Sequence, residues 1–481
     1  MKAVNFFRII SILLGIVGLT LIIPIITAFV LGEKNMILPF LIPMLVSLVL
    51  VPIINIPFRK QKINLSIRSS FVVVAGAWVS ASLFGAVPLY LSGAFASFTD
   101  CVFESFSGFT TTGATICNDV EALPRCINLW RCQTHWLGGM GIVTLTVALL
   151  PLLGVGGFQL IKAETTGPEK GKVTAKITTT AKAMWIIYSV LTVIELVLLK
   201  ICGMDFVDAL SHAFATLGTG GFSTRNASIG GFNSVAIETI ITIFMFLAGI
   251  NFSLFYYLFR RNFKEVQENS ELKAYTWITI IVILAITLFT LPNYHNFWTS
   301  LRYSSFHTVS LLTTTGFATA DFETWPYAAQ FFCFLLFFIG GCSGSTAGGV
   351  KVVRWVVLSK QVGNEVKRML HPHGIFNIRL NNNVGRKDVV FNIAAFTSVY
   401  VILILITVFA GTLVGLDLFS SLGGALSTVG NVGPGFGQLG PSHTMAEIPA
   451  ALKWWYCFAM CAGRLELYTM LIFFMPSYWR K

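Results

Sequence analysis

Residues 311–322 read LLTTTGFATADF and residues 107–115 read SGFTTTGAT, so a hydrophobic chain carries Thr-Thr-Thr-Gly twice. Three β-branched threonines followed by a glycine are poor helix formers, so neither copy fits the interior of a helix. Neither copy has a His, Cys or Lys at a constant offset, as a catalytic loop would require. The role of the two copies therefore depends on the segments around them.

The composition is typical of a chain that crosses a membrane many times. Of 481 residues, 55% are hydrophobic and 11% charged, against about 25% charged in soluble domains. A span needs about 20 apolar residues, and we predict spans at 6–31, 36–57, 69–93, 129–153, 182–203, 234–260, 274–292, 326–358, 389–413 and 449–475. The first run is too long for a signal peptide and lacks a small-residue cleavage site, so we expect a retained helix. Shorter apolar segments are typical of re-entrant half-helices: they lie near 98–110, 206–217, 299–312 and 418–428.

The basic residues predict the orientation. Of the 33 Lys and Arg, the loops that carry the short segments hold only Lys34, Arg125, Arg131, Lys200, Arg225, Arg302 and Lys453. Nearly all the others lie on the opposite side, which the positive-inside rule marks as cytoplasmic. We therefore expect a multi-pass protein of the inner (plasma) membrane, embedded in the lipid bilayer, with cytoplasmic N- and C-termini and short segments that enter from outside. Because the net charge of +12 is scattered over several loops, we expect no nucleic-acid partner.

One unit occurs four times along this map: span, short segment, glycine-containing loop, span. The loops read FTTTGAT at 109–115, ATLGTGGFS at 215–223, TTTGFAT at 313–319 and STVGNVGPGFG at 427–437. We predict an all-α polytopic membrane protein in which four pseudo-symmetric helix–pore-loop–helix repeats surround a central pore and follow two N-terminal transmembrane helices. The predicted units are 1–60 for the two N-terminal helices, 69–155, 180–261, 273–360 with a broken second helix, and 388–476.

Four re-entrant loops that meet at one axis would surround it with backbone carbonyls. Glycine can adopt positive φ, so carbonyls on both sides of it can face inward, and each short helix points its partly negative C-terminal end at the centre, which favours a cation by up to about 1 kcal/mol. We therefore predict a cation filter whose carbonyls replace the hydration shell of the ion. The predicted filter residues are Thr111, Thr112, Gly113, Thr219, Gly220, Gly221, Thr314, Thr315, Gly316, Asn431, Val432 and Gly433.

The fourfold plan with TTTGA, GTGGF, TTTGF and GNVGP resembles the superfamily of potassium transporters that contains the TrkH, KtrB and HKT proteins, over essentially the whole chain. The two extra N-terminal spans are most similar to the TrkH branch. The resemblance implies potassium uptake, with potassium as the substrate, one filter strand per repeat, and a homodimer with a pore in each protomer. It also implies a cytoplasmic ring of TrkA-like nucleotide-binding subunits, so we expect the nucleotide on that partner and no cofactor on this chain.

The four loops are unequal. Loop two has Thr219-Gly220 and loop four has Asn431-Val432 where loops one and three have Thr-Thr. The longer TVGYG of tetrameric potassium channels occurs in none of them, so we expect weaker discrimination of potassium from sodium. Some plant relatives carry serine at the first filter position and favour sodium, whereas glycine at all four aligned positions favours potassium.

The stretch IGGCSGSTAGGVK at 339–351 lies inside the closing span of the third repeat. So many glycines and small residues cannot hold a regular lipid-facing helix, so we predict a broken one; close helix packing through small residues is the alternative. The resemblance implies an intramembrane gating loop at this place. The predicted gating residues are Gly340, Gly341, Gly344, Ser345, Thr346, Gly348, Gly349, Lys351 and Arg464.

Arg464 lies deep in the last predicted span, where a charge costs at least about 2.5–3.5 kcal/mol. We expect it to face the pore below the filter, in line with the arginine that the family has in the same helix; an ion pair elsewhere is the alternative. Glu466 is a poor partner because residues two apart on a helix point in different directions. His212 and His307, in two short helices, are expected to brace the filter loops by hydrogen bonds, since a metal site needs more ligands.

Two other classes of function are weighed against the cation pore. A secondary transporter of a small organic solute also uses broken helices at mid-membrane, but it predicts paired inverted repeats, whereas the four repeats here all start on the same side. A membrane enzyme would need a nucleophile, metal cluster or acid–base pair at membrane depth, and the sequence offers no such motif. The inner basic loops, notably 351–387, are either the docking surface for the ring or ordinary cytoplasmic loops. A disulfide within the outer-loop set Cys101, Cys117, Cys126 and Cys132 is likewise left open.

Overall fold

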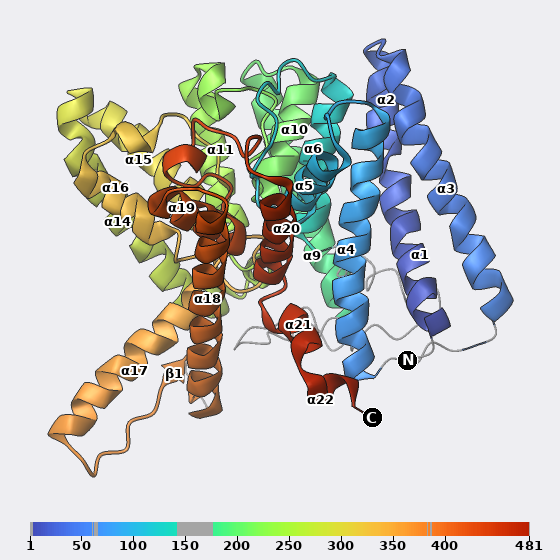
Figure 1. The fold of residues 1–481 in the computed structure, drawn as a ribbon. Helices are drawn as coiled ribbons and strands as arrows, with labels where there is room; N and C mark the ends of the chain where they lie inside the picture. The colour runs from blue at the N-terminus through green and yellow to red at the C-terminus, as the bar shows by residue number, and fades with distance from the viewer. Residues whose placement is uncertain are drawn as a thin grey trace.

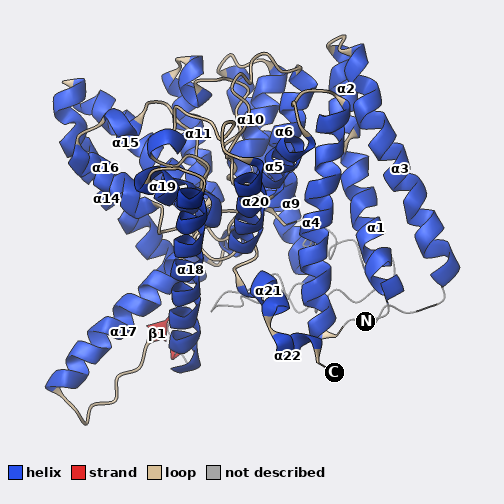
Figure 2. Ribbon diagram, in the orientation of Figure 1, coloured by secondary structure: helices blue, strands red, loops and turns tan. Residues whose placement is uncertain are grey.

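The computed structural model describes residues 3–59, 61, 66–141, 177–381, 383–384 and 387–480, which are mostly helical (Figure 2). The α-helices are α1 (Ala3–Thr20), α2 (Ile22–Val30), α3 (Ile37–Asn55), α4 (Ile67–Leu91), α5 (Phe98–Phe109), α6 (Arg125–Gly139), α9 (Ile177–Ile201), α10 (Phe206–Leu217), α11 (Val235–Ala248), α12 (Phe252–Phe259), α13 (Phe263–Gln267), α14 (Ser270–Tyr294), α15 (Phe297–Leu312), α16 (Tyr327–Leu336), α17 (Val352–Leu370), α18 (Lys387–Leu413), α19 (Leu418–Gly430), α20 (Ala450–Arg464), α21 (Tyr468–Leu471) and α22 (Pro476–Trp479). Strands β1 (Arg379–Leu380) and β2 (Asn383–Val384) form a small antiparallel pair.

The described helices include six segments long and apolar enough to cross a membrane, or up to eight if each of two bent helix pairs counts as one span. The prediction of an all-α polytopic membrane protein is confirmed. Residues 142–155, the last part of the first predicted repeat, lie outside the described residues. The disulfide that the sequence left open among the outer-loop cysteines is not formed. Free thiols are found at Cys101 in α5, at Cys117 in the loop that follows, and at Cys126 and Cys132 in α6.

Each repeat packs a short helix between an opening and a closing helix. The opening contacts are α4 with α5, α9 with α10, α14 with α15, and α18 with α19; the closing contacts are α5 with α6, α10 with α11, α15 with α16, and α19 with α20. Helix α20 of the last repeat also packs against α5 of the first. Figure 1 shows α5, α10, α15 and α19 in the half of the molecule that lies away from the two termini.

The four short helices begin with the same local signal, a polar side chain that caps the first turn. The side chains of Ser97, Asp205, Asn296 and Asp417 each accept a hydrogen bond from a backbone N–H two or three residues ahead. Such caps satisfy donors that the first turn of a helix leaves unpaired. Each short helix therefore has a fixed start and directs its C-terminal end into the bundle.

The predicted break in the third closing span is present: α16 ends at Leu336 and α17 begins at Val352. Helix α17 then runs to Leu370, beyond the predicted end of the span at 358, and projects away from the bundle (Figure 1). The spans predicted at 234–260 and 449–475 are bent pairs of helices, in which α11 and α12 meet at 93° and α20 and α21 at 118°. The carbonyls freed by the first bend hydrogen-bond to the loop before α17, which compensates for the lost helical hydrogen bonds.

Candidate functional site

The four predicted filter loops share one backbone conformation. Each has a left-handed residue followed, two positions later, by a left-handed glycine: Thr111 (φ 54°) and Gly113 (80°), Thr219 (52°) and Gly221 (82°), Thr314 (55°) and Gly316 (81°), Asn431 (53°) and Gly433 (100°). The residue between them donates its N–H to the carbonyl five residues earlier, over 2.8–2.9 Å in all four loops. The alignment of the unequal loops two and four with loops one and three is therefore reproduced in the backbone. We call residues 111–113, 219–221, 314–316 and 431–433 together the loop ring.

The loop ring is closed by backbone contacts that require glycine. A Cβ on Gly113 would lie under 3.0 Å from the carbonyl oxygen of Gly220, and one on Gly221 would lie equally close to that of Thr315. The series continues from Gly316 to the carbonyl of Val432 and from Gly433 to that of Thr112. Each loop thus touches the next, and the fourth touches the first, so the four segments surround one axis.

Hydroxyl and amide groups line the inner end of the ring. In loops one and three the hydroxyls of Thr110 and Thr112, and of Thr313 and Thr315, bond to each other over 2.8 Å. The Asn431 side chain donates to the Thr112 hydroxyl over 2.9 Å and to the carbonyl of Met460 over 3.0 Å. Thr111 Oγ1 and Asn431 Oδ1 are two of several buried side-chain oxygens of the described residues that have no hydrogen-bond partner in the protein, and they are the two that belong to the loop ring. Buried polar atoms normally have partners, so these two oxygens are suited to an ion or a water molecule.

A second layer of side chains holds the outer end of the ring. Glu104, His212 and His307 lie the same number of residues before Gly113, Gly221 and Gly316. Glu104 accepts from the Thr115 hydroxyl over 2.8 Å and the Ile116 N–H over 3.0 Å. His212 bonds to the Ser223 hydroxyl over 2.9 Å and His307 accepts from the Ala320 N–H over 3.2 Å. The hydrogen bonds expected of the two histidines are confirmed; Glu104 was missed, although its offset from Gly113 is the signal that could have found it.

Glu104 is itself part of a buried ion pair. Arg131 of α6 donates to its carboxylate over 2.7 Å through Nε, and the two side chains are almost completely buried. The same guanidinium reaches the Thr115 hydroxyl over 3.1 Å and lies 4.3 Å from the centre of the Phe222 ring. A buried charge pair is costly unless its remaining hydrogen bonds are made, and here those bonds go to Thr115 and Ile116 after loop one and to Asn128 of α6.

The loop between α16 and α17, residues 337–351, lies against the loop ring, and we call it the inner loop. The N–H of Gly348 donates to the hydroxyl of Thr314 over 2.6 Å. A Cβ on Gly348 would lie under 3.0 Å from the carbonyl of Gly430. The glycines at the two ends of the inner loop also touch, since Gly340 donates its N–H to Val350 over 2.9 Å and has no room for a side chain beside Gly348 and Gly349.

Three neighbouring elements hold the inner loop. At the α11–α12 bend, Gly249 accepts the N–H of Cys342 over 2.9 Å, and Phe252 donates its N–H to Gly344 over 3.1 Å. In the first turn of α14, Glu271 accepts the N–H of Ser343 over 2.7 Å and that of Val353 over 3.1 Å. Glu271, a further residue that sequence reasoning missed, therefore ties both sides of the inner loop to one helix.

Arg464 is the third support. Its guanidinium donates to the carbonyl of Thr346 in the inner loop over 2.7 Å, and to those of Gly138 and Gly139 at the end of α6 over 2.8 and 2.9 Å. Arg464, which belongs to the last repeat, thus joins the inner loop to the first repeat. Glu466 pairs with Arg354 of α17.

The predicted gating residues are gathered in this region. Ser345 closes a turn with the carbonyl of Cys342 over 2.6 Å, and Gly341 packs beside it. The Lys351 ammonium contacts the carbonyls of Ala347 and Gly348. Two cationic side chains, Lys351 and Arg464, therefore lie in contact with carbonyls of the segment directly next to the loop ring.

The sequence and the fold were compared with those of known proteins. Residues 38–481 match the family of TrkH cation transport proteins. The chain belongs to the TrkH family. It is 38% identical over 479 residues to the Trk system potassium uptake protein TrkH of Halomonas elongata, with 98% of each chain covered. It is 39% identical over 434 residues to the protein of that name from Escherichia coli K12, with 88% of this chain and 89% of the relative covered. The crystal structure of the potassium transporter TrkH from Vibrio parahaemolyticus matches the whole of both chains with a TM-score of 0.89 at 33% identity.

TrkH-family membership makes the chain a transporter rather than an enzyme and gives cation transport as its class of function. The superfamily resemblance noted in the sequence is thereby confirmed.

Proposed function

We propose that this chain takes up potassium across the inner membrane through the loop ring, and that the inner loop gates the pore. The observation that carries the proposal is the closed contact series of four left-handed glycines, each against the carbonyl of the next loop. Such a ring offers uncharged oxygens from four sides, which is how a cation filter replaces a hydration shell. Relatives over nearly the full chain are named potassium uptake proteins.

The contacts of the inner loop support the gate. The inner loop donates a hydrogen bond to Thr314 of loop three, and its Gly348 lies directly against Gly430 and Asn431 of loop four. Lys351 and Arg464 bring two positive charges to the same place. A cation on the axis would meet both steric and electrostatic opposition, so conduction requires the inner loop to move.

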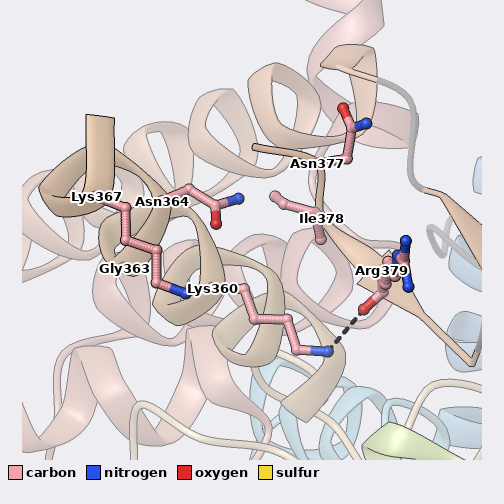
Figure 3. A pocket seen from close by; sticks show the side chains of 7 residues that line it. All are labelled: Lys360, Gly363, Asn364, Lys367, Asn377, Ile378 and Arg379. Atoms are coloured by element: carbon pink, nitrogen blue, oxygen red, sulfur yellow. Dashed lines mark hydrogen bonds between the residues drawn. The ribbon is translucent and has the colours of Figure 1, made fainter. Parts of the chain in front are cut away.

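The control of the gate is proposed to come from a TrkA-like nucleotide-binding ring on the cytoplasmic side, where both termini and α17 lie. The support is a basic pocket of about 320 Å³ between α17 and the segment before β1 (Figure 3). It is lined by Lys360, Gly363, Asn364, Lys367, Asn377, Ile378 and Arg379. An acidic surface of the partner would complement it, and α17 begins where the inner loop ends, so a pull on α17 is transmitted to the gate. The homodimer, with a pore in each protomer, rests on the family resemblance.

The test is uptake of radioactive rubidium into proteoliposomes under a potassium gradient, with potassium and sodium as competitors. We expect potassium to inhibit fully, sodium to inhibit more weakly, and Gly316→Ser to change that ratio. A chain shortened within 339–351 should conduct without the partner ring. If the shortened chain is also silent, the pore proposal is wrong, and a carrier of small organic solutes becomes the better explanation.

A further inference from the structure

Loop two lacks the threonine pair that loops one and three share. Loops one and three read Thr-Thr-Thr-Gly, whereas loop two reads Gly218-Thr219-Gly220-Gly221. The missing residues are the two whose hydroxyls bond to each other in loops one and three over 2.8 Å. Loop two nevertheless has the same φ pattern and the same backbone hydrogen bond as its neighbours. Something other than a hydroxyl pair therefore holds it in place.

The space left by both missing side chains is taken by one residue of the first repeat. A Cβ on Gly220 would lie under 3.0 Å from the Cγ, Nδ1 and Cδ2 atoms of His135. A Cβ on Gly218 would lie 2.6 Å from the carbonyl oxygen of the same His135. His135 lies on α6, which continues from the first loop, and its side chain is fully buried.

The imidazole of His135 also makes a directed contact. Its Nε2 accepts the N–H of Phe222, the residue directly after Gly221, over 3.3 Å, and its ring centre lies 4.2 Å from that of Phe222. The imidazole ring of His135 therefore contacts Gly220 of loop two on one side and Phe222, the residue directly after that loop, on the other. This contact fixes the direction of the backbone at Gly221, whose neighbouring carbonyl belongs to the loop ring.

We infer that His135 is a positioning residue for the cation filter: it replaces the threonine hydroxyl pair in loop two and sets where the Gly220 carbonyl lies in the loop ring. The inference rests on the proposed function of the ring. A difference of a few tenths of an ångström in one carbonyl changes how well the site fits a small or a large cation, so the expected readout is selectivity rather than folding.

The experiment is a double-mutant cycle at His135 and Gly220. Each variant is made in the chain whose inner loop is shortened within 339–351, and rubidium uptake and its inhibition by sodium are measured. Gly220→Thr alone should lose at least about tenfold in uptake, because the new side chain meets the imidazole. His135→Ala alone should lower the preference for rubidium over sodium several-fold, a larger effect than its effect on rubidium uptake itself. The double variant should recover uptake relative to Gly220→Thr, since the removed ring leaves room for the threonine. His135→Gln, which retains an acceptor for the Phe222 N–H, should lie between His135→Leu and the unchanged chain in selectivity.

Gln133→Leu is the matched control. Gln133 is a buried polar residue of the same helix, but it donates to the carbonyl of Thr20 over 2.8 Å, away from loop two. It should leave selectivity unchanged even if it lowers thermal stability in detergent. The inference is overturned if His135→Ala and His135→Leu keep the original rubidium-to-sodium preference, or if Gly220→Thr is tolerated beside the intact histidine. Failure of the parent chain to take up rubidium would instead overturn the proposed function, so the two failures are distinguishable.

Discussion

At the scale of the residue, glycine is required in the loop ring for two separable reasons. The backbone at all four aligned positions has positive φ, which costs a residue with a Cβ of order 1 kcal/mol. In addition, each missing Cβ points at a carbonyl of the next loop. The first reason is local to one loop, whereas the second couples two repeats.

The two reasons can be separated by comparing Gly113→Ala with Gly203→Ala. Gly203 also has positive φ (96°), but no atom lies within 4 Å of its missing Cβ. We expect Gly113→Ala to lower rubidium uptake at least about tenfold and Gly203→Ala to keep it within about twofold, although both cost similar backbone strain. Equal losses in the two variants would show that strain alone, and not contact between loops, explains the glycines.

Single residues also show how far the sequence could lead. The four glycines of the loop ring could be aligned because each lies in a loop that follows a short apolar segment and precedes a span. That alignment needs only the order of segments along the chain. Glu104 could have been found from its offset to Gly113, but its buried partner Arg131 and the imidazole beside Gly220 could not. Their contacts join segments that are far apart in the chain, and nothing local encodes such a pairing.

At the scale of the element, the inner loop is stabilised by groups that only broken helices can offer. The bend after Ala248 frees backbone carbonyls that accept from the loop, and Glu271 accepts two of its N–H groups. The break of the third closing span was predictable from its many glycines. The bends at 249–251 and 465–467 were not, because a single glycine marks the first and Glu466 and Leu467 take positive φ at the second.

Glu271→Ala should loosen the inner loop. The N–H groups of Ser343 and Val353 lose the Glu271 carboxylate as acceptor, and each buried unpaired donor costs about 1–3 kcal/mol. If the inner loop is the gate, rubidium uptake by the chain without its partner ring should rise several-fold. Glu265→Ala, at an exposed position shortly before α14, is the control and should have no effect. Lower uptake in Glu271→Ala at normal expression and stability would contradict a gating role for this loop.

At the scale of the whole molecule, outer loops join the first two repeats at some distance from the ring. Asn226, which follows loop two, donates to Asp119 over 2.8 Å and accepts the N–H of Val120 over 2.8 Å. The Asn226 side chain and the backbone N–H groups of Ala122 and Glu121 hold the pKa of Asp119 below its usual value. These hydrogen bonds therefore favour the charged form of the Asp119 carboxylate in the folded chain.

The lowered pKa fixes the sign of a pH effect. The contribution of charged Asp119 to the free energy of unfolding is fully present above the pKa of an unfolded Asp, about 3.9. It is lost as the pH falls through the lower pKa of Asp119 in the folded chain. Thermal unfolding in detergent should therefore show a steeper loss of stability below about pH 4 for the unchanged chain than for Asn226→Ala. Identical pH slopes in the two proteins would mean that this contact does not stabilise the fold.

The contact between Gly433 and the carbonyl of Thr112 has a consequence for biosynthesis. The segment that closes the loop ring is synthesised after the other three segments, and it closes against the first of the four. A nascent chain that still lacks α19 and α20 has only three of the four segments of the loop ring. The contact series of the loop ring can close only after α19 and the segment that follows it have been synthesised, so the order of translation sets the last step in its assembly.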